Sequence, residues 1–196
     1  AVPLVVNGTM YVNTNHGMVA ALDPISGEEL WVFDPESYRF GPPIQTNIMI
    51  RGIEYWTDGN IERIFVATLG KQLLSLDIDT GLPDPNFGEG GYIDLSQNLG
   101  RLEFESNFIT AGAAPIAVGD SLIVGSKIFD YGMYNRSPPG FVRAFNTYTG
   151  ELKWRFNTIP QEGEEFTETW ENNSWRTTGN TNVWTFMSAD DEAGIV

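Results

Sequence analysis

The sequence contains no cysteine, and this absence rules out disulfide bonds, thiol catalysis and metal sites built from thiolates. Basic residues are also scarce. Eleven Lys and Arg stand against 26 Asp and Glu, for a formal net charge of −15. A nucleic-acid backbone or an anionic lipid surface would repel such a chain. Nucleic acid is therefore not an expected partner.

Long apolar runs are missing as well. No stretch approaches the ~18 residues that a membrane-spanning helix needs. The first ten residues, AVPLVVNGTM, lack the basic start and the apolar run of a signal peptide. What the sequence does contain is 41% hydrophobic residues, and 13% of the chain is aromatic, which suffices for a packed core. These values predict a globular protein.

A short pattern occurs repeatedly along the chain. PLVVNGTMYVNT from Pro3 and PIAVGDSLIVGS from Pro115 each read as a strand, a two-residue turn and a second strand. Downstream of each comes a longer match, GMVAALDPISGEELW ending at Trp31 and GFVRAFNTYTGELKW ending at Trp154. A partial third copy, KQLLSLDIDTG, ends at Gly81. The sequence therefore repeats one β-rich unit.

The turn inside this unit has a clear physical basis. An Asp or Asn starts it by bonding its own downstream backbone, and Gly27, Gly81 or Gly150 closes it in the left-handed conformation. A single four-stranded sheet cannot bury its apolar face alone, so it needs copies beside it. Units spaced by roughly 50 to 70 residues favour a β-propeller, and a β-sandwich is the alternative.

We therefore expect an all-β fold, a partial β-propeller in one domain covering 1–196. The repeats fall at about 3–34, 62–95 and 115–157, and 158–196 leads into a next blade. A propeller closes with ~4 to 8 blades, whereas this chain supplies about three. The chain is accordingly interpreted as a fragment of a longer protein.

The segments AALDPISGEELW and RAFNTYTGELKW resemble the tryptophan-docking motif of the eight-bladed pyrroloquinoline quinone (PQQ) alcohol and glucose dehydrogenases. Cofactor-free propellers that act as protein-binding scaffolds carry similar repeats, and such a scaffold is the alternative function. Three further stretches resemble the enzymes: RGIEYW at 51–56, GSKIFDYG at 125–132 and TWENNSWRTTGNTNVW at 169–184. Together they favour the dehydrogenases.

This resemblance implies PQQ as the cofactor. PQQ is a flat ring system with three carboxylates and an ortho-quinone, so it calls for an aromatic face, cations and neutral hydrogen-bonding groups. The expected floor is Trp184, with Asn182 beside it, and Arg51 is expected to reach the carboxylate or quinone oxygens. Lys127 replaces a small polar residue of the alcohol-oxidising relatives, and His16 is the only histidine. Both are further candidate cofactor contacts.

The resemblance also implies a metal ion and an electron acceptor. Asp130 offers the hard oxygen that Ca²⁺, or alternatively Mg²⁺, prefers. The family's catalytic aspartate falls beyond residue 196, so no catalytic residue is expected here. The implied reaction is oxidation of an alcohol or sugar hydroxyl in the periplasm. Its electrons pass to ubiquinone or cytochrome c, and a membrane attachment would lie outside these residues.

One departure bears on the branch of the family. The alcohol-oxidising enzymes carry two adjacent cysteines a few residues before the arginine, where this chain has Gln45 and Thr46. Together with His16, this makes the sequence more similar to the glucose and quinate dehydrogenases.

Overall fold

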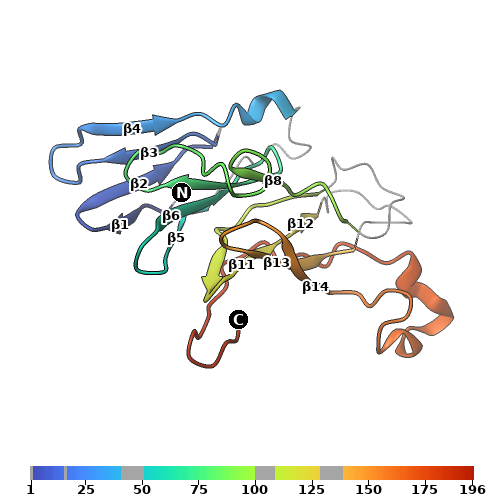
Figure 1. Cartoon of the computed structure of the whole chain (residues 1–196). Helices are drawn as coiled ribbons and strands as arrows, with labels where there is room; N and C mark the ends of the chain where they lie inside the picture. The colour runs from blue at the N-terminus through green and yellow to red at the C-terminus, as the bar shows by residue number, and fades with distance from the viewer. Residues whose placement is uncertain (1, 16, 41–50, 100–108, 129–138) are drawn as a thin grey trace.

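The computed structural model describes residues 2–15, 17–40, 51–99, 109–128 and 139–196. Within them, three four-stranded antiparallel sheets follow one another in chain order, as Figure 1 shows by the change from blue through green to orange. The predicted all-β class is confirmed. Each sheet has its own segment of the chain, whereas a sandwich would distribute the strands over two sheets.

The strands of each sheet are neighbours in sequence or nearly so. The first sheet consists of β1 (Leu4–Val6), β2 (Thr9–Asn13), β3 (Val19–Leu22) and β4 (Glu29–Phe33). The second consists of β5 (Glu54–Thr57), β6 (Glu62–Ala67), β7 (Gln72–Asp77) and β8 (Tyr92–Asp94). The third consists of β10 (Ile116–Val118), β11 (Ser121–Gly125), β13 (Phe141–Asn146) and β14 (Leu152–Asn157).

Smaller elements complete the described residues. A two-stranded ladder pairs β9 (Ile109–Thr110) with β12 (Lys127–Ile128). Three short 3₁₀ helices are η1 (Ser37–Phe40), η3 (Thr167–Thr169) and η4 (Glu171–Arg176). No helix among the described residues is long and apolar enough to span a bilayer.

The second sheet begins earlier than the repeat boundary at 62 predicted from sequence, because β5 precedes the recognisable copy. A hairpin joins β5 to β6 through a turn in which Asp58 Oδ1 accepts the N–H groups of Asn60 and Ile61 at 2.8 and 2.9 Å. This turn differs from the Asn-Gly and Gly-Asp turns of the other two hairpins. The sequence comparison of the repeats therefore missed the first strand of this unit.

The first and second sheets pack through the repeated turn and tryptophan. The Trp31 Nε1–H donates to the Ile78 carbonyl oxygen at 3.1 Å, across two different sheets. A Cβ added at Gly81 would overlap the Trp31 ring, so glycine is needed there for space as well as for its φ of 69°. Tyr11, Val19, Ile64 and other buried residues form the core between the two sheets.

Two buried arginines join the second sheet to the third. Arg63 forms an ion pair with Asp84 inside the second sheet and donates to the Thr147 carbonyl of the third at 2.8 Å. Arg143 donates to the carbonyls of Leu95 and Gln97 at 2.7 and 2.8 Å. Burial lowers the pKa of Arg143 to about 10, so the guanidinium stays charged at neutral pH. The three sheets are thus fixed to one another by polar as well as apolar contacts.

Candidate functional site

The segment from Asn180 to Met187, which we call the strap, runs along the ends of β11 and β13. The Val183 N–H donates to the Ser126 carbonyl at 3.1 Å, and the Thr158 hydroxyl donates to the Thr181 carbonyl at 3.1 Å. A Cβ added at Gly125 or Gly140 would collide with the backbone of the strap. These two glycines therefore let the strap lie directly against the third sheet.

The strap brings Trp184 into contact with Arg51, 133 residues away in sequence. The Arg51 guanidinium carbon lies 4.5 Å from the centre of the indole ring, and Nη1 donates to the Trp184 carbonyl at 3.2 Å. This geometry is a cation–π contact combined with a hydrogen bond. The indole remains 45% exposed, so aromatic surface is left for another group.

Asn182 binds the strand that carries Lys127. The Asn182 Oδ1 accepts the N–H of Ile128 in β12, the strand that also carries Lys127. The Lys127 stem passes over Gly112, where an added Cβ would lie 3.2 Å from the lysine Cδ. Because the Asn182 oxygen holds the strap to β12, a contact from this residue to an anion would come from its amide nitrogen.

Two predicted site residues cannot be placed. His16 and Asp130 lie outside the described residues, as do Gln45 and Thr46. Within the part of the chain that is described, no three His, Asp or Glu side chains gather in a way that would hold a metal ion. The predicted metal site accordingly depends on Asp130 and stays a prediction.

A small cavity of about 180 Å³ lies beside Arg51, among the first residues of successive units. Its lining includes Leu4, Ile116 and Phe186, and its one carboxylate is Glu54. The Glu54 Oε1 accepts the Ala117 N–H at 2.9 Å. Burial raises the pKa of Glu54, an effect that the charge of Asp191 increases and the Ala117 hydrogen bond opposes.

Glu54 matches none of the predicted site residues, although the sequence around it carries a signal. In RGIEYW the strand alternation places Glu54 on the same face as Trp56, which is buried. An acidic residue at an inward position of a short strand needs a hydrogen-bonding partner. The sequence therefore indicated that the Glu54 carboxylate has a hydrogen-bonding partner inside the protein.

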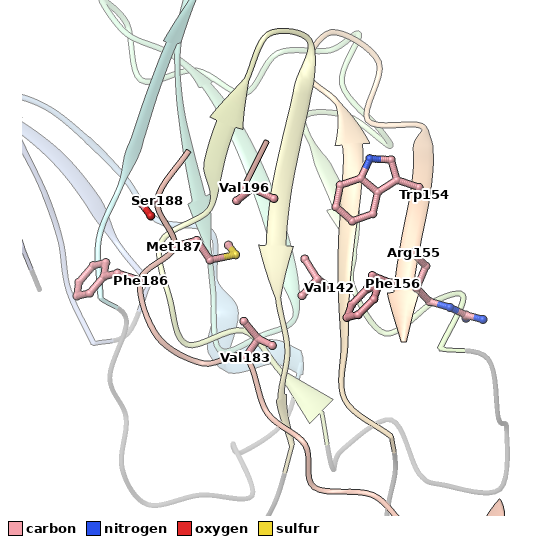
Figure 2. Close-up of a pocket in the computed structure, with 9 residues that line it drawn as sticks. All are labelled: Val142, Trp154, Arg155, Phe156, Val183, Phe186, Met187, Ser188 and Val196. Atoms are coloured by element: carbon pink, nitrogen blue, oxygen red, sulfur yellow. The ribbon is translucent and has the colours of Figure 1, made fainter. Parts of the chain in front are cut away.

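A larger apolar groove of about 770 Å³ lies between the strap and strands β13 and β14 of the third sheet. Figure 2 shows Trp154 and Phe156 on one strand beside Val142, and Val183, Phe186 and Met187 on the strap. Trp154 is the repeat equivalent of Trp31, and it is 39% exposed. In the first unit the equivalent tryptophan packs against the next sheet, whereas in the third unit the groove beside Trp154 is open.

The residues around Trp184 suit a planar anionic quinone. Trp184 offers an exposed aromatic face and Arg51 a guanidinium, which match a ring bearing carboxylates, and the strap that carries Trp184 is bonded to β12, the strand of Lys127. The strap adds Asn180, whose buried Oδ1 has no hydrogen-bond partner among the described residues. A buried amide oxygen without a donor is expected to have a further partner. The indole and the cationic donors therefore fit PQQ, whereas the Asn180 oxygen is an acceptor and calls for an N–H or O–H donor.

Successive four-stranded antiparallel sheets packed side by side define a class of protein, the β-propellers. A model of the glucose/ethanol/alcohol dehydrogenase β-propeller domain, a PQQ family, matches residues 1–196. The chain belongs to this family. The predicted membership in the PQQ dehydrogenases and the predicted propeller fold are both confirmed.

Individual relatives support the same assignment. The chain is 30% identical over 207 residues to quinohemoprotein alcohol dehydrogenase ADH IIB of Pseudomonas putida, covering 100% of this chain and 27% of that protein. It is 25% identical over 223 residues to quinoprotein glucose dehydrogenase A of Acinetobacter calcoaceticus, covering 99% of this chain and 26% of the relative. The chain thus spans about a quarter of the length of these relatives.

A solved structure agrees with the fold. Quinohemoprotein alcohol dehydrogenase ADHIIG of Pseudomonas putida superposes with a TM-score of 0.74 at 25% identity, over 97% of this chain and 26% of that one. Alcohol and glucose dehydrogenases both occur among the relatives, so the glucose and quinate branch stays a prediction.

Proposed function

We propose that the chain is part of a PQQ-dependent dehydrogenase that oxidises an alcohol or sugar hydroxyl. The observation that supports this most is the contact between Arg51 and Trp184, two residues from separate motifs that the strap carrying Asn182 brings together. A cofactor-free scaffold would have no need for a guanidinium held against a partly exposed indole.

The roles of the residues follow from their chemistry. When bound, PQQ supplies the hydride-accepting quinone. Trp184 offers a stacking surface, worth about 0.5 to 1.5 kcal/mol beyond buried area. Arg51 supplies a permanent positive charge for carboxylate or quinone oxygens, and Lys127 supplies a second. Because Arg51 already covers one face of the indole, a planar ring stacks either on the opposite face or after the guanidinium has moved aside.

The remaining parts of the proposal rest on the family resemblance. Asp130 would contribute an oxygen to a Ca²⁺ or Mg²⁺ ion, and His16 would contact the cofactor in a glucose-type or quinate-type enzyme. The base that takes the hydroxyl proton would lie beyond residue 196. We propose a periplasmic location, ubiquinone or cytochrome c as electron acceptor, and membrane attachment through other residues. The 196 residues alone would then show little or no turnover.

Equilibrium binding tests this proposal. PQQ is titrated with Ca²⁺ into the full-length protein to which the chain is assigned, and the affinity is compared with those of Arg51→Ala and Trp184→Ala. Each variant is expected to bind at least about tenfold more weakly, equivalent to about 1.4 kcal/mol. Trp154→Ala is the matched control, since it removes an indole of similar exposure outside the site. Unchanged affinity in both site variants would favour the scaffold instead.

A further inference from the structure

Strand β10 forms one edge of the third sheet, and carboxylates from both neighbouring units bind its backbone. The Ala117 N–H donates to Glu54 Oε1 at 2.9 Å, from the first strand of the second sheet. The Gly119 N–H, just after β10, donates to Asp191 Oδ1 at 3.0 Å, from the end of the chain described here. Unpaired edge N–H groups need acceptors, and these two side chains supply them.

Asp191 is held by a small hairpin. Asp190 and Ile195 pair as an isolated bridge, the Gly194 N–H donates to the Asp190 carbonyl at 2.8 Å, and the Ala193 N–H donates to Asp190 Oδ1 at 2.8 Å. This hairpin follows the strap directly. Fixing Asp191 to Gly119 therefore fixes the downstream end of the segment that carries Trp184.

Glu54 holds the segment of Arg51, the residue that contacts Trp184. It lies three residues after Arg51, at the start of β5, and both residues line the 180 Å³ cavity together with Phe186 and Met187 of the strap. The Arg51 carbonyl also accepts the Val2 N–H at 3.4 Å, from the chain leading into the first sheet. Glu54 thus ties the segment of Arg51 to β10, two residues before Gly119, which anchors the segment of Trp184.

We propose that Glu54 and Asp191 are positioning residues, which hold Arg51 and Trp184 in contact by bridging both segments to β10. Their effect on the cofactor rests on the function proposed above. Their effect on the Arg51–Trp184 contact does not, because it needs no ligand.

The charges around Glu54 make this bridge sensitive to pH. The carboxylate of Asp191 faces it from the hairpin, Arg51 lies on its own segment, and the other residues lining the cavity are apolar or glycine. Burial and Asp191 raise the pKa of Glu54, so the folded state binds this proton more tightly than the unfolded state does. The Ala117 hydrogen bond favours the carboxylate, whereas burial and Asp191 favour the acid; on balance the folded state is more stable with Glu54 protonated, and this stability is lost as the pH rises through the raised pKa.

The test uses ¹⁹F NMR of the full-length protein labelled with 5-fluorotryptophan and without PQQ, with the Trp184 signal assigned from Trp184→Phe. We expect this signal to shift between acid and neutral pH. Glu54→Gln keeps an acceptor but cannot ionise, so the signal should stay at its acidic position throughout. Glu54→Ala should place the signal at a more solvent-exposed value at every pH. Circular dichroism confirms that each variant is folded.

Two further variants keep the test decisive. Asp191→Asn should lower the pH at which the Trp184 signal shifts, because a repelling charge has been removed. Glu192→Gln, an exposed neighbour in the same hairpin, is the matched control and should leave the titration unchanged. A pH shift that persists in Glu54→Gln, or a Trp184 signal that is the same in Glu54→Ala, would overturn the positioning role.

PQQ binding separates this inference from the proposed function. If both hold, Glu54→Ala binds PQQ about tenfold more weakly, and Glu54→Gln binds it normally at neutral pH. If the ¹⁹F response fails while Arg51→Ala and Trp184→Ala still weaken PQQ binding, only the positioning role is wrong. If the ¹⁹F response holds and those two variants bind PQQ normally, only the cofactor assignment is wrong.

Discussion

Trp31 and Trp154 occupy the same position in two copies of one repeat, yet their surroundings differ. Trp31 donates a hydrogen bond to Ile78 of the next sheet and lies against Gly81. Trp154 lies at the rim of an open apolar groove and is 39% exposed. The comparison shows that the repeat specifies a residue able to dock, and that the neighbouring unit decides whether docking stabilises the fold.

The largest loss of stability is expected at Trp31, the tryptophan that packs against the next sheet. Trp31→Ala removes packing and a hydrogen bond between the first two sheets, and we expect a loss of about 3 kcal/mol. This is the low end of the range for a core aromatic, because the ring is only partly buried. Urea denaturation of this chain measures the change in the free energy of unfolding. A loss below about 1 kcal/mol would show that the contact does not hold the sheets together.

The two turn glycines give a second, more finely matched comparison. Gly81 and Gly27 have φ values of 69° and 75°, so alanine strains both turns about equally. Only at Gly81 does the new Cβ also overlap the Trp31 ring, because no described atom lies within 4 Å of a Cβ at Gly27.

Gly81→Ala should therefore destabilise the chain by about 1 to 3 kcal/mol more than Gly27→Ala does. The difference between the two urea midpoints, at equal slopes, isolates the overlap from the backbone strain. Equal losses would mean that the Trp31 ring can move without cost.

The smallest loss of stability is expected at Trp154, the tryptophan at the rim of the open groove. Trp154→Ala removes a partly exposed ring from the groove in Figure 2, and the loss should be about 0.5 kcal/mol or less in this chain. The same urea measurement checks it, with Trp31→Ala as the positive control. A loss as large as that of Trp31→Ala would show that the strap side of the groove already docks this residue.

Several features could be anticipated from the sequence, each for a physical reason. The turns at Gly27, Gly81 and Gly150 were readable because a left-handed glycine after an Asp or Asn is a local signal. The start of the second sheet could not be read in this way, because its first hairpin has a turn around Asp58 in place of the Asn-Gly or Gly-Asp turn of the other two. Local turn chemistry is therefore a good guide to repeats only where the turn itself is repeated.

The site was less accessible than the fold. The meeting of Arg51 and Trp184 was expected from the family resemblance alone, since no local pattern relates residues 133 apart. The inward position of Glu54 could be read from the strand alternation, but its partner could not, because the Ala117 N–H lies 63 residues away in sequence. The use of the Asn182 oxygen by the Ile128 N–H was likewise invisible, because it depends on how the strap crosses β12.

The central claim is that Arg51 and Trp184 act together in holding a planar anionic cofactor. A double-mutant cycle on PQQ affinity, with Arg51→Ala, Trp184→Ala and the double variant in the full-length protein, measures their coupling directly. We expect non-additive losses, with a coupling energy of about 0.5 to 1 kcal/mol or more. Strictly additive losses, or no loss in either single variant, would contradict it.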